Sequence, residues 1–173
     1  MTTPVIETER LRLRAWHESD FSGYCAHRSC DKRQAFVGGA VSAERAWDEF
    51  CAMIGFWSLR GYGTFAVAAR RSGEALGYAG LWHPPDIDEP ELCWSLFPGA
   101  EGRGYATEAA AAARDWAYEA LGLPPLMSFI HPDNAPSQAV AARLGAVFER
   151  RTTLRGAPRL VFRHVGPEAA SRP

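Results

Sequence analysis

A glycine-rich turn between an apolar strand and an alanine-rich helix is the feature that most constrains the fold of this chain. Residues 91–97 read ELCWSLF, and residues 98–113 read PGAEGRGYATEAAAAA. The first run is typical of a strand, and the alanines of the second favour helix. Glycine has no Cβ to cover the backbone, so a ligand can approach the amides of such a turn closely.

The other hydrophobic patterns predict an α/β (α+β) fold with a mixed sheet. Residues 9–16 alternate arginine or glutamate with apolar side chains, as a half-exposed strand does. A serine–glycine turn between two apolar runs predicts a hairpin. We expect strands at residues 9–16, 64–69, 75–82, 91–97, 126–130, 146–154 and 159–165, and helices at 19–30, 42–57, 104–121 and 134–144. This order predicts a mostly antiparallel sheet of six to seven strands with helices on both faces.

Two local details complete this prediction. Ser42 is expected to cap the second helix, whose buried stripe would be formed by Trp47, Phe50, Cys51, Ile54 and Trp57. The sequence RGAP at residues 155–158 is expected to form the turn between the last two strands.

Length and composition indicate one globular domain. The chain has 173 residues, of which 47% are hydrophobic and 23% are charged, and no linker-like segment divides it. We expect a single domain over residues 1–173, with a core at about 7–165 and a frayed tail at 166–173.

Charge and hydropathy argue against several partners. The 19 basic and 20 acidic residues give a net charge of -1, which provides no electrostatic footprint for nucleic acid or an anionic membrane. No segment reaches the ~18 uninterrupted apolar residues of a membrane span, and the N-terminus lacks the apolar core of a secretory signal. We therefore expect a cytoplasmic protein.

The four cysteines suit a reducing compartment. Cys25, Cys30, Cys51 and Cys93 form no CxxC pair. His27 lies between the first two and could join them as a zinc ligand, but a second ligand cluster is missing. We expect ordinary cysteines and no metal.

Three ligand interpretations compete for EGRGYATE at residues 101–108, and a tight turn without a ligand is a fourth. A nucleoside-triphosphate loop requires a lysine and a hydroxyl that are absent here. A dinucleotide fingerprint requires GxGxxG/A, and Thr107 occupies its third small position. A diphosphate cradle requires only free amides at the head of a helix, and Arg103 would add a cation.

A second segment favours the diphosphate interpretation. Residues 131–149 read HPDNAPSQAVAARLGAVFE, which places Asn134, Ser137 and Gly145 in the pattern N-x-x-S-(x)7-G. Together with GRGYATEA, this segment resembles the acetyl-CoA site of the GNAT superfamily of N-acetyltransferases. The opening ETERLRLRAWHESDF is similar to the ribosomal-protein alanine/serine N-acetyltransferase branch, and the resemblance covers roughly residues 7–165. It implies a GNAT-like fold in which the fourth and fifth strands form a splayed parallel pair.

The resemblance also implies acetyl-CoA as the acyl-donor cosubstrate. The family signature Q/R-x-x-G-x-G/A falls on residues 101–106, where Glu101 replaces glutamine or arginine. A carboxylate beside a diphosphate is unfavourable unless it turns outward. The implied cofactor-binding residues are Ser95, Leu96, Phe97, Gly102, Arg103, Gly104, Tyr105, Ala106, Thr107, Asn134 and Ser137.

The implied reaction is direct attack of a primary amine on the thioester in a ternary complex. Its catalytic candidates are Glu91 as the base and Ser137 as the acid. Many family members use a tyrosine seven residues after the asparagine, and Ala141 stands there. The alternatives are a solvated glutamate at a strand end and a serine that bonds back to its own helix.

Other groups could serve the same reaction. His83 and His131 lie at predicted strand ends and are further candidates for the base, although His131 before a proline is better explained as a loop residue. Within the strand at 91–97, Glu91 shares one face with Cys93 and Ser95.

The acceptor is expected to be a protein N-terminal amine or a small-molecule amine. The acidic sequence PPDIDEP at residues 84–90 could attract it, although an ordinary solvated loop is the interpretation we prefer. The alternative function is a CoA-binding or acyl-CoA-binding module with weak or no transferase activity. Members of the branch are monomers or homodimers, and we expect one of these states.

Overall fold

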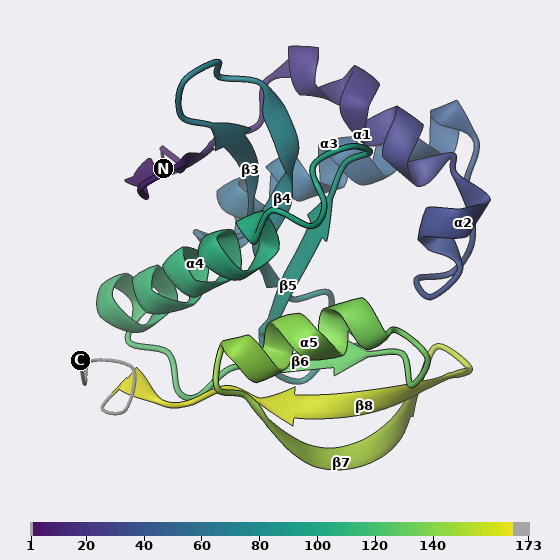
Figure 1. The fold of residues 1–173 in the computed structure, drawn as a ribbon, viewed down its shortest axis with the longest axis vertical. Helices are drawn as coiled ribbons and strands as arrows, with labels where there is room; N and C mark the ends of the chain where they lie inside the picture. The colour runs from purple at the N-terminus through teal and green to yellow at the C-terminus, as the bar shows by residue number, and fades with distance from the viewer. Residues whose placement is uncertain (1, 168–173) are drawn as a thin grey trace.

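The computed structural model describes residues 2–167, which form one eight-stranded mixed sheet with helices around it (Figure 1). The strand order is β1-β2-β3-β4-β5-β6-β8-β7. The strands are β1 (Ile6–Glu7), β2 (Leu11–Arg14), β3 (Thr64–Ala69), β4 (Ala75–Trp82), β5 (Glu91–Leu96), β6 (Met127–Ile130), β7 (Val147–Leu154) and β8 (Ala157–Arg163). The helices are α1 (Phe21–Arg28), α2 (Asp31–Gln34), α3 (Ala43–Arg60), α4 (Tyr105–Leu121) and α5 (Ala135–Arg143), and a 3-10 turn at Glu18–Asp20 precedes α1.

The predicted fold class is confirmed, but the sheet is larger than the expected six to seven strands. β1 and α2 were not predicted, because elements of two and four residues are too short to show a period in the sequence. β1 is fixed by its antiparallel register with β2, in which Ile6 lies opposite Leu13.

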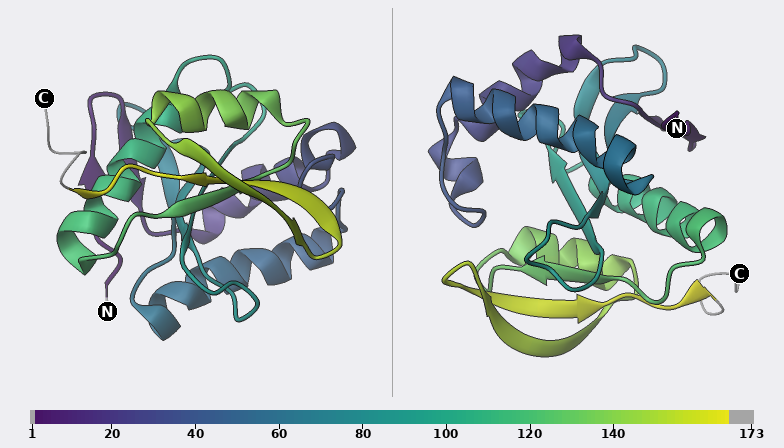
Figure 2. Two further views of the ribbon diagram at one scale, coloured as in Figure 1. Left: turned by 90° about the horizontal axis from the view of Figure 1, so that it is seen from below. Right: turned by 180° about the vertical axis from the view of Figure 1, so that it is seen from behind.

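Helices cover both faces of the sheet (Figure 2). On one face, α4 buries Ala109 and Ala113 in the same cluster as Phe65 and Leu92. The short alanine side chains let this helix lie close to the strands. On the other face, α1 and α3 enclose an aromatic cluster, in which the ring centroids of Trp16 and Phe50 are 5.3 Å apart.

The buried stripe of α3 differs from the predicted one. Its buried side chains are those of Ala46, Phe50, Met53 and Trp57. Trp47 and Ile54 are 41% and 42% exposed, and Cys51 is also exposed, so these three assignments to the core were wrong. The reason is geometric: a helix stripe recurs every three or four residues, and Trp47, Cys51 and Ile54 form the neighbouring stripe, one residue further along. Ser42 caps the helix as predicted, by accepting the Arg45 amide at 3.2 Å.

The sheet opens between β5 and β6. These parallel strands share only the register pair Glu91–Met127 within residues 2–167, whereas β4 and β5 pair at every residue from Gly77 to Trp82. β6 instead pairs with β8, which carries the C-terminal half of the sheet away from β5 (Figure 1). The splayed parallel pair is therefore present.

The β7–β8 hairpin turns on two residues with positive φ, Arg155 at 50° and Gly156 at 76°. Such values are those of a tight hairpin turn. The predicted four-residue turn was too long, because Ala157 and Pro158 already belong to β8. Of the predicted tail, residues 168–173 lie outside the described residues. No helix within residues 2–167 combines the length and apolar character needed to cross a membrane.

Candidate active site

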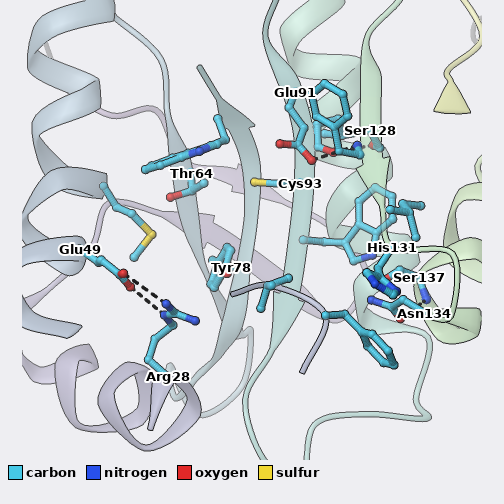
Figure 3. A pocket seen from close by; sticks show the side chains of 18 of the residues that line it. Arg28, Glu49, Thr64, Tyr78, Glu91, Cys93, Ser128, His131, Asn134 and Ser137 are labelled. Carbon is cyan, nitrogen blue, oxygen red and sulfur yellow. Dashed lines mark hydrogen bonds and ion pairs between the residues drawn. The ribbon is translucent and has the colours of Figure 1, made fainter. Parts of the chain in front are cut away.

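A cavity of about 710 Å³ lies at the opening between β5 and β6 (Figure 3). One wall comes from α1 and α3, and the opposite wall comes from β6, the loop after it and the β7–β8 hairpin. The α-helical wall carries an ion pair between Arg28 and Glu49 at 2.7 Å. The predicted residues Glu91, Asn134 and Ser137 come from three separate elements, and all line this one cavity.

Glu91 is the first residue of β5 and forms the single register pair, with Met127, that joins β5 to β6. Its Oε1 atom accepts the amide of Phe129 at 3.0 Å. Desolvation raises the pKa of Glu91 to about 7, although the Phe129 hydrogen bond and the positive charges of Arg159 and Arg155 oppose this rise. A carboxyl group with a pKa near neutrality can exchange a proton at physiological pH, as a general base must.

The cavity lining includes residues from both predicted faces of β5, Glu91 and Cys93 from one and Leu92 and Trp94 from the other. Glu91 and Cys93 follow one another along the cavity floor (Figure 3). Burial, and then the neighbouring Glu91 carboxylate, raise the pKa of the Cys93 thiol well above its usual value. Tyr78 on β4 also lines the floor and was missed by sequence reasoning, because its register opposite Ser95 is set by strand pairing.

Asn134 and Ser137 lie at the start of α5. The Asn134 Oδ1 atom accepts the amide of Ser137 at 3.2 Å and so caps the helix. The Ser137 hydroxyl makes no hydrogen bond to any other side chain or carbonyl described in residues 2–167, so the bond back to the helix is not formed. Figure 3 shows both side chains beside His131 at the cavity wall.

The two histidines considered as bases differ in position. His131 lines the cavity, and its Nδ1 atom accepts the amide of Asp133 at 3.1 Å. His83 is not among the cavity residues, and its Nδ1 atom lies 2.6 Å from the Tyr62 hydroxyl. Of the two, only His131 lies where an acceptor amine could reach it.

The glycine turn lies at the head of α4. Gly102 and Gly104 have φ values of 73° and 80°, in the left-handed region that favours glycine. A Cβ at Gly102 would meet no atom within 4 Å, so the space above the turn is open. The helix ladder begins with the Glu108 amide and the Gly104 carbonyl at 3.1 Å, which leaves the preceding amides without helical acceptors.

The head of α4 is held from the N-terminal segment of the chain. The Glu108 carboxylate accepts the Thr8 hydroxyl at 2.5 Å and the Arg10 amide at 3.0 Å. Arg10 also donates from Nη1 to the Arg103 carbonyl at 2.8 Å. These contacts fix the turn before any ligand is present, and they assign Glu108 a supporting role.

The Glu101 carboxylate bonds to groups other than the amides of residues 102–107. Its carboxylate forms an ion pair with Arg33 of α2 and accepts the Gly99 amide at 2.9 Å. Partial desolvation opposes ionisation, but the hydrogen bond and positive charge of Arg33, together with backbone hydrogen bonds, outweigh it and the pKa of Glu101 is lowered. The negative charge of Glu101, which departs from the family signature, is thus balanced by Arg33. Arg33 lies on α2, a short helix that was not predicted from the sequence.

The directions of the β5 amides show which peptide groups could form hydrogen bonds with an acyl donor that lies along this strand. The Phe97 amide donates to the Leu76 carbonyl at 2.8 Å and therefore points toward β4. Amide directions alternate along a strand, so the amides of Trp94 and Leu96 point toward the opposite edge, where β6 diverges. This edge connects the cavity to the turn at the head of α4.

The three residues of this segment that were predicted to bind the cofactor, Ser95, Leu96 and Phe97, are therefore not equivalent. Leu96 presents its amide to the open edge, whereas the Phe97 side chain is 5% exposed and packs in the aromatic cluster. Ser95 directs its hydroxyl to the Nε2 atom of His27 at 2.9 Å. If Ser95 and Phe97 contact the cofactor as predicted, they do so through atoms other than the Ser95 hydroxyl and the Phe97 amide.

The residues weighed for metal binding, His27, Cys25 and Cys30, do not form a metal-ligand cluster. His27 is buried against Ser95, and Cys25 and Cys30 are free thiols. Within residues 2–167, no group of three or more His, Cys, Asp or Glu side chains could hold a metal ion.

Two of the three carboxylates in the acidic loop before β5 are paired with arginines of the C-terminal half. Asp86 is paired with Arg155 at 2.8 Å, and Glu89 is paired with Arg163 at 2.7 Å. These carboxylates are therefore not free to attract a cationic acceptor.

The splayed sheet, the open turn at a helix head and the cavity at the splay together define an acyltransferase fold. The chain belongs to the GNAT acetyltransferase family, because the model of the acetyltransferase (GNAT) domain matches residues 10–147. The predicted family and enzyme class are confirmed, and acetyl-CoA is the donor that this family uses.

Solved structures agree with this assignment. An acetyltransferase from Agrobacterium tumefaciens is 38% identical, with a TM-score of 0.87, over 95% of this chain and 96% of that chain. RimJ from Mycobacterium smegmatis, in complex with CoA-disulfide, is 20% identical, with a TM-score of 0.73, over 94% and 84%. The ribosomal-protein-S5-alanine acetyltransferase from Vibrio fischeri is 18% identical, with a TM-score of 0.74, over 94% and 96%. The last two likenesses concern the fold alone.

Proposed function

We propose that the protein transfers the acetyl group of acetyl-CoA to a primary amine, of a protein N-terminus or of a small molecule, by direct attack in a ternary complex. The observation that carries this proposal is the position of Glu91, a carboxyl group with a pKa of about 7 at the rung where β5 and β6 separate. There it faces the cavity that an acceptor would enter.

The residues present fit the donor. We assign the diphosphate to the amides of residues 102–107, because the turn is open above Gly102 and the head of α4 carries a partial positive charge. The exposed side chain of Arg103 adds a cation. The pantetheine arm would follow the open edge of β5 toward Asn134, pairing with the amides of Trp94 and Leu96.

The donor supplies an acetyl thioester, whose carbonyl carbon is the electrophile. The amine nitrogen forms a bond to this carbon, the carbon–sulfur bond breaks, and the sulfur leaves with the electron pair. Glu91 takes the proton that the amine loses, directly or through water. Ser137, which lines the cavity, gives a proton to the departing thiolate and recovers one from solvent. CoA and the N-acetylated amine are the products.

Thiol release from acetyl-CoA over a panel of amines and N-terminal peptides tests the proposal. We expect release with at least one acceptor, formation of its acetyl amide by mass spectrometry, and loss of most of this activity in Glu91→Gln. Tight CoA binding without release from any acceptor would instead support a CoA-binding module.

A further inference from the structure

Three arginines recur every four residues from the turn of the β7–β8 hairpin along β8: Arg155, Arg159 and Arg163. They differ in their ion-pair partners. Arg155 makes a two-pronged contact with Asp86 at 2.8 and 2.9 Å. Arg163 makes a similar contact with Glu89 at 2.7 and 2.9 Å. Both of these guanidinium groups are thus satisfied by the loop before β5.

Arg159, between them, has no such partner. It makes one hydrogen bond, to the carbonyl of the adjacent Pro158 at 2.9 Å, and no ion pair with any residue in 2–167. Its side chain is half-buried and lines the cavity. It shares a face of β8 with Val161, which lies opposite the cavity residue Phe129. Its charge acts on the Glu91 carboxyl group, but its donors bond to no carboxylate within residues 2–167. A half-buried guanidinium with free donors is a ready site for an anion, since Arg donates in a fork that fits a carboxylate.

The other charges of the cavity do not compete for this position. Glu49 is occupied by Arg28 at 2.7 Å and Arg45 at 3.5 Å on the opposite wall. Apart from the Glu91 carboxyl group, the cavity residue Asp48 of α3 is the remaining acid, and it has no ion pair within the described chain. Two unpaired charges of opposite sign thus come from opposite walls, with Glu91 at the floor between those walls.

We propose that the acceptor carries a carboxylate in addition to its amine, and that Arg159 binds this carboxylate. The proposal rests on the proposed function, because it assigns a substrate class to the same site. Asp48 would attract the ammonium form during entry, and Arg159 would hold the other end of the molecule while the amine reaches Glu91. Arg159 acts here as a specificity-determining residue and takes no part in the proton transfers.

A matched acceptor series tests this assignment. The probes are ω-amino carboxylic acids of increasing chain length, each compared with its carboxamide, in a thiol-release assay with acetyl-CoA. At the best length we expect the carboxylate to exceed its carboxamide by about tenfold or more in kcat/KM, as a charge-assisted hydrogen bond would provide. In Arg159→Gln this preference should vanish, and Arg159→Lys should retain part of it.

Arg151→Gln is the matched control, because it removes the same charge from an exposed position of β7 in the same hairpin. It should keep the full carboxylate preference. Equal kcat/KM for carboxylates and carboxamides in the unmodified protein, or an unchanged preference in Arg159→Gln, would overturn the assignment while leaving the acetyltransferase proposal intact.

A binding measurement separates the two proposals if no acceptor releases thiol. That result would contradict the proposed function. The melting temperature of the CoA-bound protein is then measured with each probe. A rise that carboxylates cause in the unmodified protein but not in Arg159→Gln would support the carboxylate site, and the absence of any such rise would refute it.

Discussion

The guanidinium group of Arg33 forms an ion pair with the carboxylate of Glu101, which lies 68 residues further along the chain. Glu101 occupies the first position of the family's diphosphate-binding signature, where glutamine or arginine is usual. The pair explains how a carboxylate is tolerated beside this site, because its charge is matched by a cation from a different helix.

Removing Arg33 should therefore weaken CoA binding through Glu101. We expect Arg33→Ala to raise the Kd for CoA by roughly two- to fivefold, since an exposed pair contributes up to about 1 kcal/mol. Glu101→Gln should restore most of this loss when added to Arg33→Ala. Isothermal titration calorimetry of the double-mutant cycle measures the coupling. Arg12→Ala, which removes an arginine paired with Glu7, is the control. Equal affinity in Arg33→Ala and the unmodified protein would contradict this account.

The glycine at the head of α4 can be tested against a matched glycine elsewhere. Gly104 and Gly73 have φ values of 80° and 75°, so alanine at either position is strained by about 1–2 kcal/mol. A Cβ at Gly73 would meet nothing within 4 Å, whereas one at Gly104 would approach the Arg10 side chain to 3.4 Å. We expect similar losses of stability, but a loss of CoA affinity of about tenfold only in Gly104→Ala.

Deleting the proposed base should change the pH dependence as well as the rate. The raised pKa of Glu91 means that it is protonated, and inactive as a base, below about pH 7. Activity should therefore rise with pH to a bend near 7. In Glu91→Gln we expect a rate about 100-fold lower, in keeping with general-base catalysis, and no such bend.

An acceptor amine also titrates, so the bend must be assigned by comparison. The same acceptor is used for both proteins and for Glu119→Gln, an exposed residue of α4. Persistence of the bend near pH 7 in Glu91→Gln would assign it to another group and remove Glu91 from the mechanism.

The stability of the fold should decrease in mild acid because of a buried histidine. The Ser128 hydroxyl donates to the Leu92 carbonyl at 2.5 Å, and its oxygen lies 2.8 Å from the His164 Nε2 atom, which must therefore carry the proton. Burial, and then nearby arginines, lower the pKa of His164 to about 4. Because the unfolded value is near 6.5, the stabilisation present above pH 6.5 is lost as the pH falls toward 4.

Glutamine at position 164 can donate the same hydrogen bond without gaining a proton. We expect the melting temperature of His164→Gln to fall less between pH 7 and pH 5 than that of the unmodified protein, measured by circular dichroism. His27 is buried in the same way and accounts for part of the remaining fall. The exposed His17→Gln is the control, and an equally steep fall in His164→Gln would refute this explanation.

Sequence reasoning succeeded where the signal is local. The hairpin of β3 and β4 and the bounds of α4 follow from turn residues and periodicity, and Ser42 caps α3 as its chemistry suggested. It failed for β1 and α2, which are too short to have a period, and for Trp47, which is large and apolar but faces outward.

Part of the site could not be predicted because it depends on contacts between distant segments. Arg159 is left without an ion pair because Asp86 and Glu89 of the loop before β5 bind Arg155 and Arg163 instead. Tyr78 reaches the cavity floor through strand register. Glu91, Asn134 and Ser137 were predicted as candidates and do share the cavity, but their catalytic roles stay predictions.

The single register pair between β5 and β6 leaves the amides of Trp94 and Leu96 without a neighbouring strand in the described chain. A donor lying along the free edge of β5 would act as the missing strand and make the hydrogen-bonded ladder continuous. Slowed hydrogen exchange at the amides of Trp94 and Leu96 on binding would then report that this ladder has formed.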